Sequence, residues 1–148
     1  MRSLVIDASV ATRFLLEEDY AEQAQDVLEE FIEGNLDLSA PRLIMAEVGN
    51  AMRTAVARGI VGDVEASGMY SKLLDLGLGR IELTDEDHRR ILELSIRRKM
   101  SFYDAVYVYC SKVNGAALLT ADDSQVRCAE GEAEVVHLRD FRKRSAAS

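Results

Sequence analysis

The chain has 148 residues, of which 48% are hydrophobic and 30% are charged, and its formal net charge is −8 at pH 7. This length most simply makes one domain, residues 1–140, followed by a basic tail, residues 141–148, that we expect to fray. The acidic balance argues against broad electrostatic adhesion to nucleic acid. A nucleic-acid substrate would therefore need a local basic patch and a bound cation.

The sequence predicts a reduced, cytoplasmic protein without contact with a membrane. No apolar run reaches the roughly 20 residues of a membrane span, and the N-terminus lacks the apolar core of a signal peptide. Cys110 and Cys128 do not form a C-x-x-C pair, and their apolar neighbours favour buried thiols. His88 and His137 lie in unrelated segments, which disfavours a zinc site built on them.

Short apolar runs alternate with longer helical patterns, which is typical of a parallel sheet covered by helices. In chain order, strands are predicted over Leu4–Ile6, Leu36–Ser39, Ile81–Leu83, Ala116–Thr120 and Glu134–Leu138. Helices are predicted over Ser9–Glu18, Ala21–Glu33, Pro41–Arg58, Val64–Leu76, Thr84–Arg97, Ser101–Val113 and Ser124–Ala129. The sequence therefore predicts an α/β fold with a parallel sheet of about five strands.

Four acidic residues occupy positions where a carboxylate is costly. Asp7 and Asp122 each follow an apolar strand. Glu47 lies within the apolar stripe of its helix, and Asp104 opens a helix that is apolar nearly all round. A carboxylate removed from water costs several kcal/mol unless a partner compensates its charge. No Lys or Arg lies at helical spacing on the face of Glu47, so a shared divalent cation is the simplest compensation.

Each acid, taken alone, also has a structural explanation. Asp7 and Asp122 fit helix caps, and Asp104 completes a capping-box pattern. Glu47 fits an acid at the edge of the stripe, with its stem packed and its carboxylate in water. Asp123 fits a second ligand, a cap or a solvent-exposed residue equally well.

Jointly, the four acids fall where a parallel sheet brings residues to one crevice, at the carboxyl ends of its strands. Carboxylate oxygens are hard ligands that suit Mg²⁺ or Mn²⁺ rather than zinc. Mg²⁺ keeps several of its waters and binds through few carboxylates together with substrate phosphate. The sequence therefore predicts a divalent metal site for phosphoryl chemistry.

Four motifs occur in a fixed order along essentially the whole chain. They are Leu4-Val5-Ile6-Asp7-Ala8-Ser9-Val10, the helical Glu47, Ser101-Phe102-Tyr103-Asp104-Ala105 and Leu119-Thr120-Ala121-Asp122-Asp123. Together they resemble the PIN domain, and more narrowly the VapC-type toxins of prokaryotic toxin–antitoxin pairs. The resemblance implies a three-layer α/β/α sandwich with strand order 3-2-1-4-5. It also implies RNA cleavage with Mg²⁺ or Mn²⁺, homodimers, and silencing by a cognate antitoxin.

The resemblance also assigns roles by position. The catalytic acids that it implies are Asp7, Glu47, Asp104 and Asp122, and the hydroxyls that steady them are those of Ser9 and Thr120. It leaves the role of Asp123 open. We therefore hypothesise an endoribonuclease in which Asp7 and Asp104 bind the cation directly or through water. Glu47 and Asp122 then complete the charge and orient a water whose pKa the cation lowers.

The basic segment Arg97-Arg98-Lys99, just before the Asp104 motif, is a candidate for contact with RNA phosphates. Its alternative is a solvated helix end that interacts favourably with the helix dipole. A phosphatase of the haloacid-dehalogenase type is disfavoured because Ala8-Ser9-Val10 lacks its second acid, and a receiver domain is disfavoured by the missing acidic pair. A DNA-directed nuclease and a non-catalytic PIN scaffold stay open as alternatives.

The helix predicted over Val64–Leu76 carries more apolar side chains than a small sheet needs for cover. They include Met69, Tyr70, Leu73 and Leu74. We expect part of this surface to be buried in a homodimer and part against an antitoxin segment that brings an Arg or Lys into the acidic cleft. The alternative is that these side chains simply cover the sheet.

Overall fold

A computed structural model of the protein describes residues 1–144. Its centre is a five-stranded parallel sheet with the order β3-β2-β1-β4-β5, which confirms the predicted fold class and strand order. The strands are β1 (Arg2–Ile6), β2 (Leu36–Pro41), β3 (Gly79–Ile81), β4 (Ala117–Thr120) and β5 (Val135–His137).

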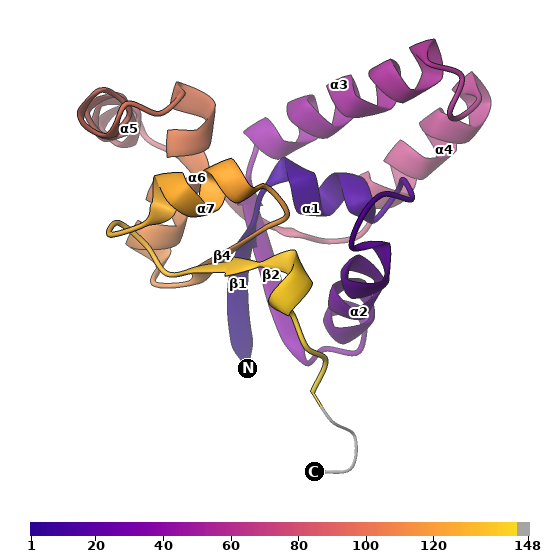
Figure 1. The fold of residues 1–148 in the computed structure, drawn as a ribbon, viewed down its shortest axis with the longest axis horizontal. Helices are drawn as coiled ribbons and strands as arrows, with labels where there is room; N and C mark the ends of the chain where they lie inside the picture. The colour runs from indigo at the N-terminus through magenta and orange to yellow at the C-terminus, as the bar shows by residue number, and fades with distance from the viewer. Residues whose placement is uncertain (145–148) are drawn as a thin grey trace.

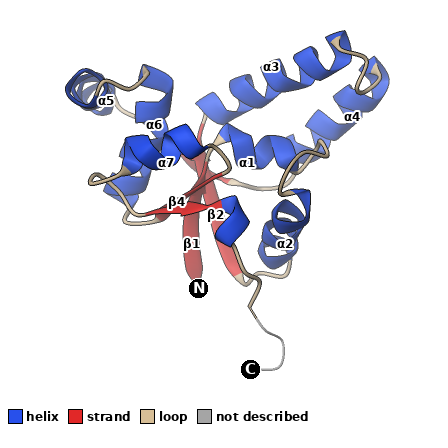
Figure 2. Cartoon of the chain, viewed as in Figure 1, coloured by secondary structure: helices blue, strands red, loops and turns tan. Residues whose placement is uncertain are grey.

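Helices cover both faces of this sheet. They are α1 (Ala8–Arg13), α2 (Ala21–Ile32), α3 (Leu43–Ala57), α4 (Asp63–Leu74), α5 (Asp85–Arg98), α6 (Phe102–Asn114) and α7 (Asp123–Ala129), followed by the 3₁₀ helix η1 (Leu138–Asp140). Figure 1 shows α5, α6 and α7 on one side of the strands and α1 and α2 on the other, and α3 and α4 extend from the second side. Figure 2 shows the strands enclosed between these helical layers.

The chain changes direction across the sheet between β1 and β4. Successive strands run outward from β1 through β2 to β3, and the chain then crosses to β4 and β5 on the other side. The amide of Asp7 extends the β1–β4 pairing by donating to the carbonyl oxygen of Leu119 at 3.3 Å. Parallel sheets bind ligands at the carboxyl ends of the strands beside such a switch point.

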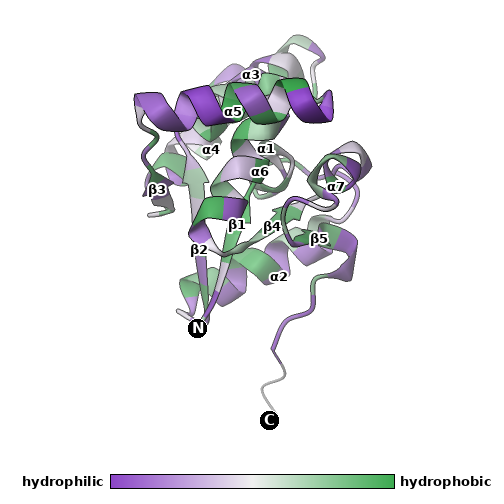
Figure 3. Ribbon diagram, turned by 90° about the vertical axis from the view of Figure 1, so that its left-hand side faces the viewer, coloured by the Kyte–Doolittle hydropathy of each residue, from purple (hydrophilic) through white to green (hydrophobic). Residues whose placement is uncertain are grey.

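The two strands at the switch point are buried on both faces, as their apolar sequences predicted. Leu4, Val5 and Ile6 of β1, and Leu118 and Leu119 of β4, are almost completely inaccessible to water. Figure 3 shows β1 and β4 below α5, which is hydrophilic over much of its length. The residues that follow β1 and β4 are therefore held by the most rigid part of the core.

The helix predicted over Ser9–Glu18 is shorter than expected and ends at Arg13. The next residues include the acids Glu17 to Asp19, which would lie at the negative end of the helix dipole. The Arg13 side chain folds back instead, donating from Nη1 to the Ser9 carbonyl oxygen at 2.9 Å and from Nε to the Asp19 carbonyl oxygen at 2.8 Å. These contacts turn the chain towards α2.

The predicted end of β2, the predicted start of α3 and both predicted ends of β3 were each wrong by two residues. Pro41 ends β2 rather than opening α3, which begins at Leu43. Its missing N–H costs nothing towards β1, because that pairing has already ended at Ser39. In β3 the strand begins at Gly79, where an added Cβ would lie 3.2 Å from the Ser39 Cβ. A side chain at this position would push the neighbouring strand by a few tenths of an ångström, and glycine avoids that shift.

The C-terminal segment is packed further than we predicted. Phe141, which we placed in the frayed tail, is buried, and the Arg2 guanidinium lies 5.6 Å from the centre of its ring. Lys143 Nζ contacts Glu29 Oε2 at 2.7 Å. An aromatic side chain placed against the start of β1 accounts for this ordering. The rest of the predicted tail, residues 145–148, lies outside the described residues.

Within residues 1–144, no helix is both long enough and apolar enough to span a membrane. The two cysteines are free thiols, and Cys110 is buried as predicted whereas Cys128 is half-buried. Burial raises the pKa of the Cys110 thiol to about 12, so this group stays protonated.

Candidate active site

Asp7 stands at the end of β1 with both carboxylate oxygens engaged. Ser9 Oγ donates to Oδ1 and Thr120 Oγ1 donates to Oδ2, each at 2.5 Å. The amides of Ser9 and Val10 also donate to Oδ1, at 3.0 and 3.4 Å, so Asp7 caps α1 as well. Asp7 therefore caps α1 through Oδ1 alone, which accepts the two amides and the Ser9 hydroxyl. The capping role is compatible with a role as a candidate catalytic acid.

The environment of Asp7 opposes its ionisation. The residue is only 6% exposed, and burial raises the pKa of its carboxyl group from 3.8 to about 6, although the hydrogen bonds from Ser9 and Thr120 act in the opposite direction. No Lys or Arg contributes to this shift. A cation at this position would relieve the cost of the buried charge.

The hydroxyl of Thr120 joins Asp7 to the segment that carries Asp122. Thr120 ends β4 and is fully buried, and besides donating to Asp7 its oxygen accepts the amide of Asp122 at 3.1 Å. The amide of Ala121 donates to Ser9 Oγ at 2.8 Å. The end of β1 and the end of β4 are thus tied together through the two hydroxyl residues that the sequence motifs singled out.

Glu47 lies in the second turn of α3 and is half-buried. Tyr107 of α6 donates its hydroxyl to Glu47 Oε1 at 2.6 Å. Burial raises the pKa of Tyr107 well above its usual range, and the charges of Glu47 and Asp7 raise it further. Tyr107 therefore stays protonated, and it lies close enough to both acids for their charges to raise its pKa.

Asp104 and Asp122 form a second pair of acids. Asp104 lies in the first turn of α6, where its amide donates to Ser101 Oγ at 3.0 Å, and Asp122 caps α7 by accepting the amide of Ser124 at 2.9 Å. The pKa of the Asp104 carboxyl group is raised, chiefly by burial and further by the charge of Asp122. Two carboxylates that repel each other in this way favour a cation between them.

Asp123 is engaged elsewhere. Its Oδ1 lies 3.2 Å from Arg139 Nη1 and 3.3 Å from His137 Nε2. The Nδ1 atom of His137 accepts the amide of Arg139, so the proton of the neutral ring is on Nε2 and faces Asp123. Burial lowers the pKa of His137, which keeps that ring neutral. The carboxylate of Asp123, which is exposed, is thus paired with Arg139 of η1 and lies beside His137 at the end of β5.

The donor set suits a hard divalent cation. The oxygens that gather at this edge are carboxylates and hydroxyls, which favour Mg²⁺ or Mn²⁺ over softer metals. Within residues 1–144, no three His, Cys, Asp or Glu side chains converge closely enough to hold one ion together. Mg²⁺ needs only one or two protein carboxylates when waters and phosphate fill its other positions, so pairs of acids are a suitable arrangement.

The basic segment before α6 is partly engaged in ion pairs. Glu132 has a side chain that is only 6% exposed and accepts Arg97 at 2.7 Å, Arg98 at 3.3 Å and Lys112 at 2.9 Å. Hydrogen bonds from Arg97 and Lys112 lower the pKa of Glu132 to about 2. Lys99 ends α5 in the left-handed conformation. Three cations around one acid leave a local excess of positive charge.

Two residues near the acids were missed by the sequence analysis. Tyr107 was taken only as part of an apolar helix, although a buried tyrosine needs a partner for its hydroxyl. Gln125 of α7 is almost fully buried and donates from Nε2 to the Asp104 carbonyl oxygen at 3.2 Å. Tyr107 lies three positions after Asp104, and Gln125 lies three positions after Asp122. This spacing from a candidate acid is the signal that would have identified both residues.

Comparison with known proteins agrees with this geometry. Residues 4–131 match the PIN domain. The chain is also 30% identical over 121 residues to Ribonuclease VapC3 from Pyrobaculum aerophilum, an alignment that covers 80% of this chain and 88% of that protein. The chain belongs to the PIN domain family, as its four motifs predicted, and it is similar to a VapC-type member.

Solved structures share the fold. PAE2754 from Pyrobaculum aerophilum superimposes with a TM-score of 0.71 and 23% identity, covering 93% of this chain and 92% of that one. VapBC2 from Rickettsia felis, solved bound to a DNA fragment from their promoter, gives a TM-score of 0.63 with 8% identity, covering 91% and 98% of the two chains. At these identities the likeness supports the fold alone.

Proposed function

We propose that this protein is a Mg²⁺- or Mn²⁺-dependent endoribonuclease that acts as the toxin of a toxin–antitoxin pair. The observation that carries the proposal is Asp7, a buried carboxylate with a raised pKa, linked by Ser9 and Thr120 to the segment of Asp122. Membership of the PIN domain family and the likeness to Ribonuclease VapC3 support the reaction type.

In this proposal Asp7 and Asp104 hold the cation, and Glu47 and Asp122 act through water. A bound divalent cation would supply a Lewis acid for the scissile phosphate and lower the pKa of the attacking water. Ser9 and Thr120 fix the Asp7 oxygens, and Tyr107 fixes one oxygen of Glu47. The side chains are thus oriented before substrate arrives, which reduces the entropy lost in reaching the transition state.

The RNA backbone must approach an acidic chain, so positive charge near the site matters. The cluster of Arg97, Arg98 and Lys112 around Glu132 carries two positive charges in excess of its one negative charge. Together with Lys99, it is our proposed contact for phosphates outside the cleavage site.

Cleavage of matched substrates tests the function. A 5′-labelled single-stranded RNA and a DNA of the same sequence are incubated with purified protein in Mg²⁺, in Mn²⁺ and in excess EDTA. We expect cleavage of RNA only, and only with added metal. Asp104→Asn should abolish it, whereas Asp37→Asn, which changes an exposed acid at the opposite end of β2, should not.

Three results would contradict the proposal. Cleavage of the DNA alone would favour the DNA-directed nuclease. Full RNA cleavage in EDTA would remove the role of the metal. A folded protein that cuts neither substrate would favour the non-catalytic scaffold.

We also propose that the groove between α3 and α4 receives a partner segment from the antitoxin. The groove has a volume of about 470 Å³ and is lined mainly by apolar residues and by Arg53, Asp63 and Tyr70. The helix α4 uses part of its predicted stripe internally, because Leu73 is buried and Tyr70 donates to the Met45 carbonyl oxygen at 2.6 Å. The exposed apolar residues Leu92 and Ile96 of α5 are our proposed contribution to a homodimer.

A further inference from the structure

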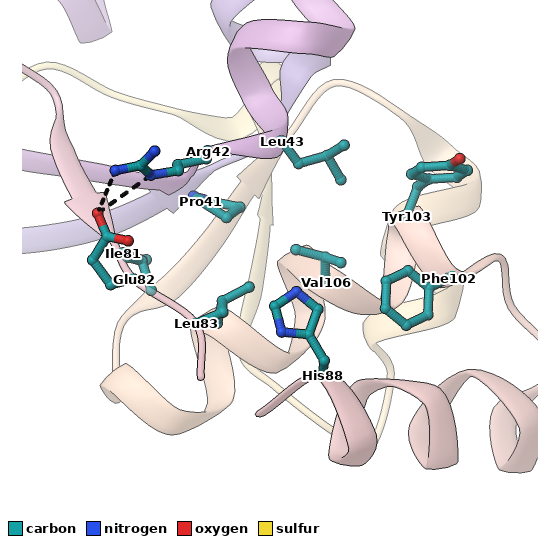
Figure 4. A pocket seen from close by; sticks show the side chains of 10 residues that line it. All are labelled: Pro41, Arg42, Leu43, Ile81, Glu82, Leu83, His88, Phe102, Tyr103 and Val106. Carbon is teal, nitrogen blue, oxygen red and sulfur yellow. Dashed lines mark hydrogen bonds and ion pairs between the residues drawn. The ribbon is translucent and has the colours of Figure 1, made fainter. Parts of the chain in front are cut away.

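Beside the hollow that contains Glu47 lies a pocket that the cleavage chemistry does not use. It has a volume of about 230 Å³ and opens between the ends of β2 and β3 and the helices α5 and α6. Its lining includes Arg42, Glu82, His88, Phe102 and Tyr103. Figure 4 shows the pair of Arg42 and Glu82 at one end of this space and the rings of Phe102 and Tyr103 at the other.

The pocket adjoins the candidate active site. Leu43 and Tyr103 line both this pocket and a neighbouring hollow that contains Glu47. Tyr103 is also the residue before Asp104. A group seated in the pocket therefore lies beside the hollow that contains Glu47.

The lining combines aromatic surface with polar groups at one end. Tyr103 is 59% exposed, so its ring is accessible to a partner that enters the pocket. The Nδ1 atom of His88 lies 2.8 Å from the Thr84 carbonyl oxygen and must donate to it, so Nε2 of the neutral ring is an acceptor. Arg42 and Glu82 are exposed and 3.4 Å apart, a weak contact that a guest can replace.

These features suit a planar, apolar group with hydrogen-bonding edges. Proteins that recognise single-stranded RNA splay out a base, stack it on aromatic or guanidinium planes, and bind its edge with polar groups. On the basis of the proposed ribonuclease function, we propose that this pocket binds one unstacked nucleobase of the substrate next to the scissile phosphate. It would thereby determine which base flanks the cut.

Nucleotide binding tests the pocket without requiring cleavage. The four nucleoside 5′-monophosphates are titrated separately into ¹⁵N-labelled protein and followed by NMR. We expect at least one of them to shift the amides of Leu83, His88 and Val106 at millimolar concentration. Tyr103→Ala should lose these shifts, and Tyr103→Phe should keep them because it retains the stacking surface. Absence of such shifts in the native protein would overturn the proposal.

Cleavage of a random-sequence single-stranded RNA pool tests the consequence for specificity. We expect the native protein to favour one base at a fixed position beside the cut, and Tyr103→Ala to weaken that preference by about 10-fold. Val113→Ala, which alters an exposed apolar residue near the other end of α6, should leave the preference unchanged. An unchanged preference in Tyr103→Ala would overturn the proposal.

Different results would contradict the proposed ribonuclease function and the proposed base-binding pocket. If the native protein cuts no RNA but nucleotides still shift the pocket amides, the ribonuclease function fails and the base site stands. If RNA is cut while Tyr103→Ala changes only the oligomeric state in sedimentation, the pocket is part of an interface between copies of the chain. That result would overturn the base site and leave the ribonuclease intact.

Discussion

Tyr107 and Glu47 are 60 positions apart in sequence and are joined by a hydrogen bond of 2.6 Å from the tyrosine hydroxyl to Oε1. Tyr107 is only 3% exposed, so its ring cannot move without disturbing the core between α6 and the sheet. The orientation of the Glu47 carboxylate is therefore set by α6, the same helix that carries Asp104.

Tyr107→Phe should lower RNA cleavage by about 10- to 100-fold, because Glu47 loses the group that orients it. The unfolding free energy should fall by about 1 kcal/mol. Tyr109→Phe is the matched control, since Tyr109 donates to Asp87 at 2.5 Å from the same helix. Steady-state kinetics at saturating Mg²⁺ and urea melts compare the two. Equal activity losses in both variants would show that Tyr107 acts only through stability.

Asp7→Asn should abolish cleavage and stabilise the metal-free protein at neutral pH. The folded-state pKa of Asp7 is raised from 3.8 to about 6, so the folded protein binds the proton more tightly than the unfolded chain. Stability from this group is complete below about pH 4 and is lost as pH rises through about 6. The cost at pH 7 is at most about 3 kcal/mol, and asparagine removes it.

Urea melts in EDTA at pH 4 and pH 7.5 measure this effect. The advantage of Asp7→Asn over the native protein should be present at pH 7.5 and nearly absent at pH 4. Asp37→Asn should show no such pH dependence, because Asp37 is exposed. A variant that is less stable than the native protein at both pH values would mean that lost hydrogen bonds outweigh the relieved charge.

Binding of Mg²⁺ near pH 6 should release protons. Burial raises the pKa of Asp7 to about 6, so a fraction of the Asp7 carboxyl groups is protonated at this pH and must ionise to hold a cation. Burial also raises the pKa of Asp104, which acts in the same direction. Calorimetric titration in two buffers with different ionisation enthalpies should give different heats. Identical heats would show that metal binding does not draw on these protonated carboxyl groups.

Glu132→Gln should destabilise the junction of α5, α6 and the loop before β5. The pKa of Glu132 is lowered to about 2, so its contribution is present above about pH 4.5 and disappears as pH falls towards 2. Water and salt screen its exposed partners, which limits the loss at pH 7 to about 1–2 kcal/mol. Glu130→Gln, an exposed neighbour, is the control. Equal stabilities of the two variants at low salt would contradict a structural role for Glu132.

Ser67→Trp should prevent binding of the antitoxin without affecting RNA cleavage. Ser67 is exposed and lines the groove between α3 and α4. A bulky ring at this position would occupy the groove and exclude the antitoxin segment that we propose to bind there. Expression of the native protein should slow growth, and the product of the adjacent gene should relieve this and co-purify. Glu65→Trp, which is exposed on α4 outside the groove lining, should retain the partner. Retention by Ser67→Trp as well would place the partner elsewhere.

The general architecture could be read from sequence because it depends on local patterns. The apolar runs of β1 and β4 required strands buried on both faces, and the direction of chain crossing then fixed the edge where Asp7 and Asp122 lie. The acids themselves were identifiable because each interrupted an apolar pattern. That signal depends only on neighbours in sequence.

The details that sequence did not reveal depend on pairs that are distant along the chain. The partner of Tyr107 lies on α3, and Glu132 gathers cations from α5 and α6. No spacing rule connects such residues, because their contact depends on how helices pack in three dimensions.

The pairing of β1 with β4 also determines when during synthesis the site can exist. Asp7 is synthesised 113 positions before Thr120, and Asp122 follows two residues later. A chain still held on the ribosome with β4 inside the exit tunnel has Asp7 but lacks the hydroxyl that holds its second oxygen. Until β4 has been synthesised and has paired with β1, the site around Asp7 is therefore incomplete.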